Sequence, residues 1–159
     1  MPPDPGEAAY HPWDRSRSRA WALQVHYRWE TEGRERDLPE VVQEVLETRY
    51  VSPRRSPYLV RIVQELHDHL GDVDRALRGA LENWRLERLS LMDRGILRIA
   101  AAEILFLDDI PPKVSIQEAV HLAERYGGDD SPRFVNGVLD ALFKDAARAD
   151  ALEGSSMTG

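Results

Sequence analysis

Hydrophobic positions recur with the period of an α-helix in almost every segment between the two ends of the chain. Ala20, Leu23 and Tyr27, for example, have the i, i+3 and i+7 spacing that places side chains on one helical face. The pattern breaks at residues that end helices, such as Gly33 and the Pro111-Pro112 pair. Between the breaks it predicts about seven helices, and we find no convincing alternation of apolar and polar residues typical of β-strands. The sequence therefore predicts an all-α fold.

Several helix boundaries can be assigned to particular residues. Ser90 is expected to cap a helix, because Asp93 follows at the spacing of a capping box. The apolar residues of 96–106 then lie nearly all round that helix, which is typical of a central buried element. Gly71 is expected to end the third helix, and Ser131 to cap the last one.

The two ends of the chain differ in composition from the part between them. Residues 1–14 are rich in proline and residues 148–159 in glycine and serine, so we expect two disordered tails around one helical domain, 15–147. The N-terminus lacks the pattern of a signal peptide. No apolar run approaches the ~20 residues that cross a membrane. We therefore expect a cytoplasmic protein without membrane contact.

Signatures of catalysis and of metal binding are absent from the sequence. The chain has no cysteine, no glycine-rich phosphate loop and no Gly-x-Ser-x-Gly motif. His67 and His69 are two residues apart, so on a helix they point to different faces, and we interpret the histidines as surface residues. The pairs Asp108-Asp109 and Asp129-Asp130 lie next to helix starts, where negative charge is favourable. We expect no catalytic residue, no metal and no cofactor.

The distribution of charge leaves two interpretations open. A formal net charge of -7 disfavours nucleic-acid binding by the chain as a whole, since phosphate contacts dominate such binding. Arg15, Arg17 and Arg19, however, alternate with two serines where the first helix is expected to begin. Such a segment either binds RNA phosphates or is a solvated, solubilising stretch.

Three aromatic residues, Tyr27, Tyr126 and Phe134, fall near expected helix ends or turns. Rings in such places can remain exposed and stack on the bases of a single strand, at ~1–3 kcal/mol per base. The alternative is that each ring belongs to the hydrophobic core. The sequence pattern alone does not place the three rings together.

The stretch from Met92 to Leu142 closely resembles the C-terminal half of the NusB family. The matching segments are ILRIA at 96–100, IPPKV at 110–114 and DSPRFVNGVLD at 130–140. The last of these motifs is highly specific. The N-terminal half matches more loosely, and the resemblance covers about residues 15–143.

This resemblance implies an all-helical fold built as two packed helical sub-bundles. It further implies a transcription antitermination factor that binds boxA single-stranded RNA of ribosomal operons. NusE, a small-subunit ribosomal protein, would be the protein partner, within an RNA polymerase antitermination complex. The fold also occurs as a domain of some RNA cytosine methyltransferases, and we expect no methyltransferase module here. Both a monomer and a homodimer stay open for the free protein, since the family includes both.

The resemblance also assigns functional positions. Asp93 matches an acidic position that faces NusE. Ser16 and Ser18 depart from the more continuous basic arm of the family, which reduces the expected phosphate attraction. The alternative function is therefore a protein-interaction scaffold that docks a basic ribosomal protein with little RNA contact. The residues expected to bind RNA are Arg15, Arg17, Arg19, Tyr27, Tyr126, Asp130 and Phe134.

Overall fold

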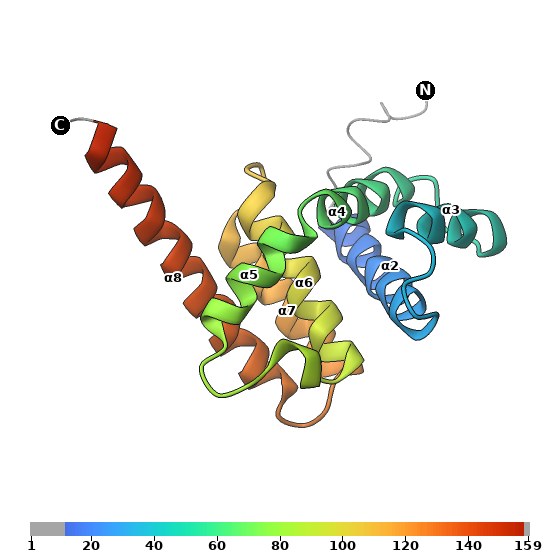
Figure 1. Cartoon of the computed structure of the whole chain (residues 1–159). Helices are drawn as coiled ribbons and strands as arrows, with labels where there is room; N and C mark the ends of the chain where they lie inside the picture. The colour runs from blue at the N-terminus through green and yellow to red at the C-terminus, as the bar shows by residue number, and fades with distance from the viewer. Residues whose placement is uncertain (1–11, 158–159) are drawn as a thin grey trace. The chain divides into compact units, whose positions relative to one another are not determined.

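The computed structural model describes residues 12–157, which form seven α-helices and one short 3₁₀ helix, with no strand in that range. The chain divides into two compact units, Met1–Leu70 and Gly71–Gly159 (Figure 1). Buried hydrophobic side chains form a core in each of them. The prediction of an all-α fold is confirmed, and the division agrees with the two sub-bundles that the resemblance implies.

The first unit consists of three helices that all contact one another: α2 (Pro12–Thr31), α3 (Leu38–Thr48) and α4 (Ser56–Asp68). Helices α3 and α4 each turn one apolar face inward, because their hydrophobic residues recur every three or four positions. The buried side chains of α2 include polar ones in its first half, such as Ser18 and Arg19. Gly33 follows α2 at φ 78°, in the left-handed region that glycine adopts without a Cβ clash, which confirms the predicted break. The core of this unit includes Leu23, Val25, Val41, Val45, Leu59, Ile62 and Leu66.

The second unit is built around α6. This helix packs against α7 and α8, and α7 also packs against α8. The last turns of α8 extend beyond the other helices of the unit (Figure 1). In chain order, its elements are α5 (Leu70–Ala80), η1 (Leu86–Arg88), α6 (Leu91–Phe106), α7 (Pro112–Tyr126) and α8 (Ser131–Met157).

Helix α6 confirms two of the predictions. The Ser90 hydroxyl accepts a hydrogen bond from the backbone N–H of Asp93 at 3.1 Å, as expected of a cap. Every residue from 95 to 103 is buried, as expected of a central helix. Burial of Arg98 within this stretch is compensated by Asp74 of α5, which accepts two hydrogen bonds from the guanidinium at 2.9 and 3.1 Å.

The third helix ends differently from the prediction. Helix α4 stops at Asp68, and the chain bends at His69, whose φ and ψ are -122° and 22°. Gly71, expected to follow the end of that helix, instead lies in the first turn of α5. Helix formation resumes so soon because Asp72 places a negative charge in the first turn, beside the positive end of the helix dipole.

The structure also differs from the prediction at both ends of the helical domain. Helix α2 already begins at Pro12, since a proline in the first turn gives up no helical hydrogen bond. Helix α8 continues to Met157, although the sequence predicts disorder from residue 148 onward. The alanines, arginine and leucine of 146–152 favour a helix enough to continue it. The remainder of the two predicted tails, 1–11 and 158–159, lies outside the described residues.

One histidine is not at the surface. His26 is buried in the first unit, with its ring centre 5.7 Å from that of Trp29. Its Nε2 lies 3.8 Å from a carboxylate oxygen of Glu30, one turn further along α2. The interpretation of all five histidines as surface residues is therefore wrong for His26.

Candidate nucleic-acid interface

The three arginines of the expected RNA arm all lie in the first half of α2 rather than ahead of it. Arg15 and Arg19 are four residues apart and therefore share a helical face, whereas Arg17 lies on a different one. Arg15 and Arg19 therefore have one set of neighbouring residues, and Arg17 has another.

Arg19 is buried, with only 3% of its surface exposed. Its Nη2 lies 3.5 Å from the hydroxyl oxygen of Tyr58, a buried residue of α4, and its guanidinium lies 5.5 Å from the centre of that ring. The guanidinium of Arg15 lies 4.8 Å from the same ring centre and is half-buried. Tyr58 therefore holds two arginines by cation–π contact, and Arg19 acts mainly in the packing of α2 against α4.

Arg17 lies on the more open side of the helix. Its guanidinium stacks over the exposed ring of Trp13, 4.6 Å from the ring centre. This pair combines a charge that attracts phosphate with a flat ring that can stack on a base. The sequence prediction missed Trp13, because it placed residues 1–14 in a disordered tail.

Ser18, one of the two departures from the family arm, has a structural role. Its hydroxyl is buried and shares its proton between the carbonyl oxygens of Asp14, at 2.8 Å, and Arg55, at 2.9 Å. The Arg55 guanidinium in turn lies 3.4 Å from the Asp14 carboxylate. The serine therefore ties the start of α2 to the start of α4, a bond that an alanine could not make.

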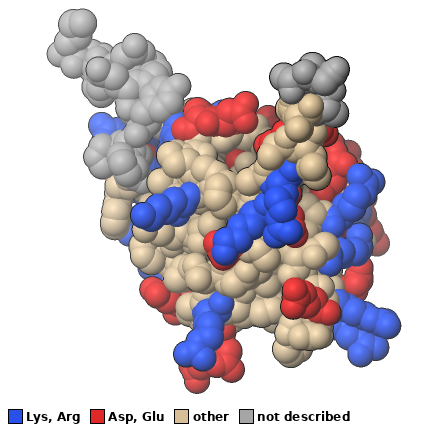
Figure 2. Space-filling model, turned by 90° about the vertical axis from the view of Figure 1, so that its left-hand side faces the viewer, with Lys and Arg blue, Asp and Glu red and all other residues tan. Residues whose placement is uncertain are grey.

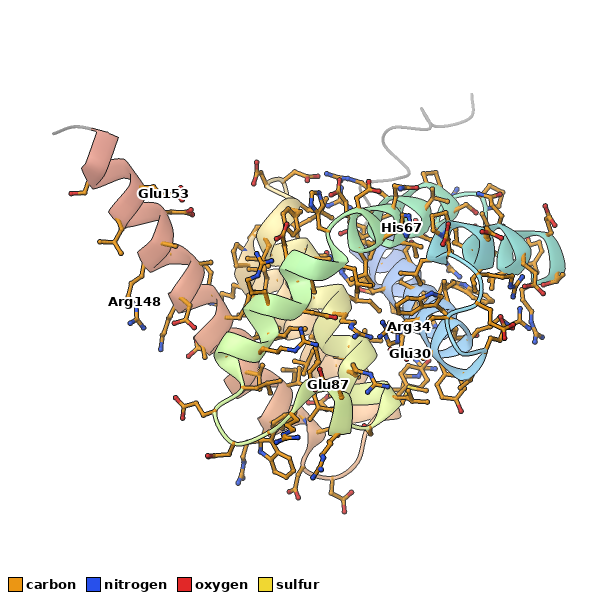
Figure 3. The ribbon with its side chains drawn as sticks, in the orientation of Figure 1. Glu30, Arg34, His67, Glu87, Arg148 and Glu153 are labelled. Atoms are coloured by element: carbon orange, nitrogen blue, oxygen red, sulfur yellow. The ribbon has the colours of Figure 1, made fainter. Side chains whose placement is uncertain are left out.

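Tyr27 lies further along α2 and is 42% exposed, so its ring remains open to a ligand. The charges around it are mostly paired. Figure 3 shows Glu30 and Arg34 directed toward each other, at 2.7 Å between Oε1 and Nη2. The Arg34 guanidinium also stacks over Trp29, 4.3 Å from the ring centre. The guanidinium of Arg34 is therefore already engaged by Glu30 and Trp29.

Arg36 and Arg78 are also paired with carboxylates. The Arg36 guanidinium forms hydrogen bonds with Glu32 and Glu44, which raise the pKa of Arg36 above its ordinary value. Arg78 donates hydrogen bonds to Glu87, which lower the pKa of the Glu87 carboxyl and raise that of Arg78. On the face shown in Figure 2, basic and acidic side chains are interspersed among uncharged ones.

The remaining expected RNA residues lie in the second unit, close to the turn between α7 and α8. Tyr126 ends α7 and is 38% exposed, with the Arg125 guanidinium 5.6 Å from its ring centre. Asp130 is exposed in the turn, and Phe134 lies half-buried in the first turn of α8. All three are therefore within reach of solvent.

This turn requires a glycine. A Cβ atom on Gly127 would approach the Cβ of Ser131 to 2.6 Å and the carbonyl oxygen of Ala123 to 2.8 Å. The Ser131 hydroxyl accepts a hydrogen bond from the N–H of Gly128 at 2.9 Å. Ser131 is the first residue of α8 and closes the turn, whereas the sequence predicted it to precede and cap the helix.

The turn borders a hollow of about 400 Å³ that brings three of the expected site residues together. Asp130 and Phe134, expected to bind RNA, and Asp93, expected to face NusE, line the same hollow. The Oδ1 atom of Asp93 is buried and has no hydrogen-bond partner among the described residues. Tyr126 does not line this hollow. Its other lining residues are Trp84, Arg88, Leu89, Ser90, Gly128, Asp129 and Ser131.

Trp84 is a second aromatic residue that the sequence analysis did not assign. Its ring centre lies 6.0 Å from that of Phe134, at an interplanar angle of 72°, and the side chain is 62% exposed. Its sequence context holds a signal, since the residues directly before and after this tryptophan, Asn83 and Arg85, are polar.

Within residues 12–157, no three side chains of the metal-binding types are grouped so as to hold an ion. No helix in that range combines the length and apolar character needed to cross a bilayer. The Nε2 atom of His69 lies 3.4 Å from a carboxylate oxygen of Glu65, four residues earlier in the sequence.

Comparison with known proteins gives a consistent assignment. The model of the NusB family matches residues 16–144. The transcription antitermination protein NusB of Trichlorobacter lovleyi is 39% identical over 140 residues, which are 86% of this chain and 96% of that protein.

Solved structures agree with this result. A crystal structure of T. maritima NusB matches with a TM-score of 0.74 and 36% identity, over 82% of this chain and 90% of that one. A second match, with a TM-score of 0.73 and 28% identity, comes from the structure of the antitermination factors NusB and NusE in complex with dsRNA. It covers 83% of this chain and 97% of that one. The chain belongs to the NusB family.

Proposed function

We propose that this protein is a transcription antitermination factor that binds boxA-type single-stranded RNA of ribosomal operons together with NusE. The observation that carries the proposal is the match to the NusB family across residues 16–144. A solved relative in complex with NusE and dsRNA supports both partners. The protein acts by binding in the cytoplasm, within an RNA polymerase antitermination complex, and has no catalytic step of its own.

The exposed side chains divide the work of RNA binding. Arg15 and Arg17 attract phosphates, whereas Arg19 holds α2 against Tyr58 and supports them from within. The rings that stack on bases are those of Tyr27, Tyr126 and Phe134.

The acidic residues of the hollow have roles other than phosphate binding and base stacking. Asp130 lies at its rim and repels nearby phosphates. Asp93 contacts NusE through the exposed part of its side chain, since its Oδ1 atom is buried.

A scaffold that docks NusE with little RNA contact is the second candidate function. The observation in its favour is the burial of Arg19, which leaves the arm with two arginines that can reach RNA. The net charge of -7 also suits a basic protein partner.

Binding of a labelled boxA-type RNA, with and without NusE and at several salt concentrations, tests the proposal. Tyr27→Ala should weaken RNA binding by about 5- to 150-fold, the effect of losing one base stack. Tyr50→Ala is the matched control, because Tyr50 is an exposed tyrosine of the same unit outside the expected site. Its RNA affinity should equal that of the parent.

Two results would count against the proposal. If the parent protein binds NusE and shows no affinity for RNA in either condition, the scaffold function replaces RNA binding. Equal affinities of the Tyr27 and Tyr50 variants would remove Tyr27 from the RNA path. Sedimentation of the free protein, done in parallel, distinguishes monomer from homodimer.

A further inference from the structure

Trp84 lies exposed on a short segment whose two ends are anchored in the core of the second unit. The segment joins α5 to η1, and both of its ends are anchored by buried leucines, Leu81 and Leu86. The backbone N–H of Leu81 also continues the hydrogen bonding of α5 by donating to Leu77. A large ring left 62% exposed on an anchored segment can bind a ligand without first being ordered.

The rings of Trp84 and Phe134 together separate two hollows of the second unit. Their edge-to-face geometry, at 6.0 Å and 72°, is a favourable arrangement for aromatic pairs. On one side lies the hollow of about 400 Å³ that contains Asp93 and Asp130. On the other side lies a hollow of about 380 Å³ lined by Leu81, Val138, Ala141, Gly137, Glu82, Asn83, Ala80 and Arg133. Both rings line both hollows.

The two hollows differ in charge. The first has three carboxylates, those of Asp93, Asp129 and Asp130, beside one arginine. The second has Arg133 and a single carboxylate, that of Glu82. A phosphate is therefore better accommodated on the Arg133 side of the rings than on the other.

The guanidinium of Arg133 is available for such a contact. In the part of the chain that the structure describes, it forms no ion pair and no side-chain hydrogen bond. Other arginines of this unit are held internally, Arg78 by Glu87 and Arg98 by Asp74. An exposed ring with an adjacent unpaired guanidinium is the combination that binds single-stranded nucleic acid without reading its sequence.

We propose that Trp84 and Arg133 form an additional subsite for single-stranded RNA, in which a base stacks on Trp84 and Arg133 binds an adjoining phosphate. The subsite extends the RNA path past Phe134 and across the wall between the two hollows. It rests on the proposed function, since it lengthens the same RNA interface. A protein docked on the exposed tryptophan is the competing occupant, and the experiment separates the two.

The test measures the affinities for RNA and for NusE separately, using a labelled single-stranded boxA-type RNA. Trp84→Ala should weaken RNA binding by about 5- to 150-fold and leave NusE affinity unchanged. Trp84→Phe keeps an aromatic face and should retain most of the RNA affinity. Thermal unfolding of both variants checks that the segment still folds. RNA should also quench tryptophan emission less in Trp84→Phe than in the parent.

The arginine is tested by the salt dependence of RNA binding. Arg133→Gln should reduce the slope of log affinity against log salt by about 0.7, the value for one phosphate contact on a single strand. Arg75→Gln is the control, because Arg75 is an exposed arginine of the same unit that pairs with Asp72 at 3.2 Å. That variant should keep the slope of the parent.

Three outcomes overturn the subsite, and they differ from one another. If the parent binds RNA and Trp84→Ala binds it equally well, the subsite is wrong and the proposed function stands. If Trp84→Ala loses affinity for NusE but not for RNA, the ring is a protein-docking residue. If the parent binds no RNA at all, the subsite and the proposed function fail together.

Discussion

The structure predicts that the three arginines of α2 contribute to RNA binding in different ways. Arg15 and Arg17 are half-exposed, whereas Arg19 is 3% exposed and contacts Tyr58. The perturbation that separates them is a pair of variants, Arg15→Gln with Arg17→Gln in one protein and Arg19→Gln alone in another. Glutamine removes the charge in each case and keeps a polar, though shorter, side chain.

The expected magnitudes follow from the number of phosphates that each variant can no longer neutralise. One contact on a single strand contributes about 0.7 to the slope of log affinity against log salt, so the double variant should lose about 1.4. Arg19→Gln should leave the slope nearly unchanged. It should instead lower the free energy of unfolding by about 1–3 kcal/mol, because a buried donor to Tyr58 and its cation–π contact are lost.

The assay is RNA binding by fluorescence anisotropy across a series of salt concentrations, with urea unfolding of each protein alongside. A control that changes both exposed arginines to lysine keeps the two charges and should keep the parent slope. The reasoning is refuted if Arg19→Gln flattens the slope by about as much as one phosphate contact while the stability of the protein is unchanged. Arg19 would then reach the RNA, and its burial against Tyr58 would not describe the bound state.

Three further predictions concern the second unit. Asp130→Asn should tighten RNA binding by about 0.5–1 kcal/mol, because the exposed carboxylate repels phosphate through screening solvent; unchanged affinity at low salt in the same binding assay would contradict this. Asp74→Ala should lower the free energy of unfolding by about 3–5 kcal/mol, since it removes the carboxylate that faces the buried Arg98; urea denaturation measures the loss, and a loss below about 1 kcal/mol would show that the pair contributes little. Gly127→Ala should destabilise the protein by about 1–3 kcal/mol, because the new Cβ has no room. Gly128→Ala, whose Cβ would meet nothing closer than 3.9 Å, should unfold nearer the parent temperature, and equal melting of the two variants would contradict the steric account.

Most of the helices could be predicted from the sequence because their signals act over a few residues. The hydrophobic period, the Ser90 cap and the Pro111-Pro112 break all depend on neighbours within one or two turns. Gly71 shows the limit of such local rules. A glycine after an apolar run indicates a helix end, but the acidic residue that follows it favours a new helix in the same place.

The sequence by itself determined the helical fold class and, through its motifs, the family. Only the tertiary structure decided which charged and aromatic groups remain available for a ligand. Arg19 is withdrawn from solvent because Tyr58, far along the chain, packs against it, and Ser18 is needed there to tie two helices together. Trp84 and Arg133 come together only because the segment after α5 folds back beside α8. Burial depends on which faces meet, and that is set by residues distant in sequence, whose positions no local pattern encodes.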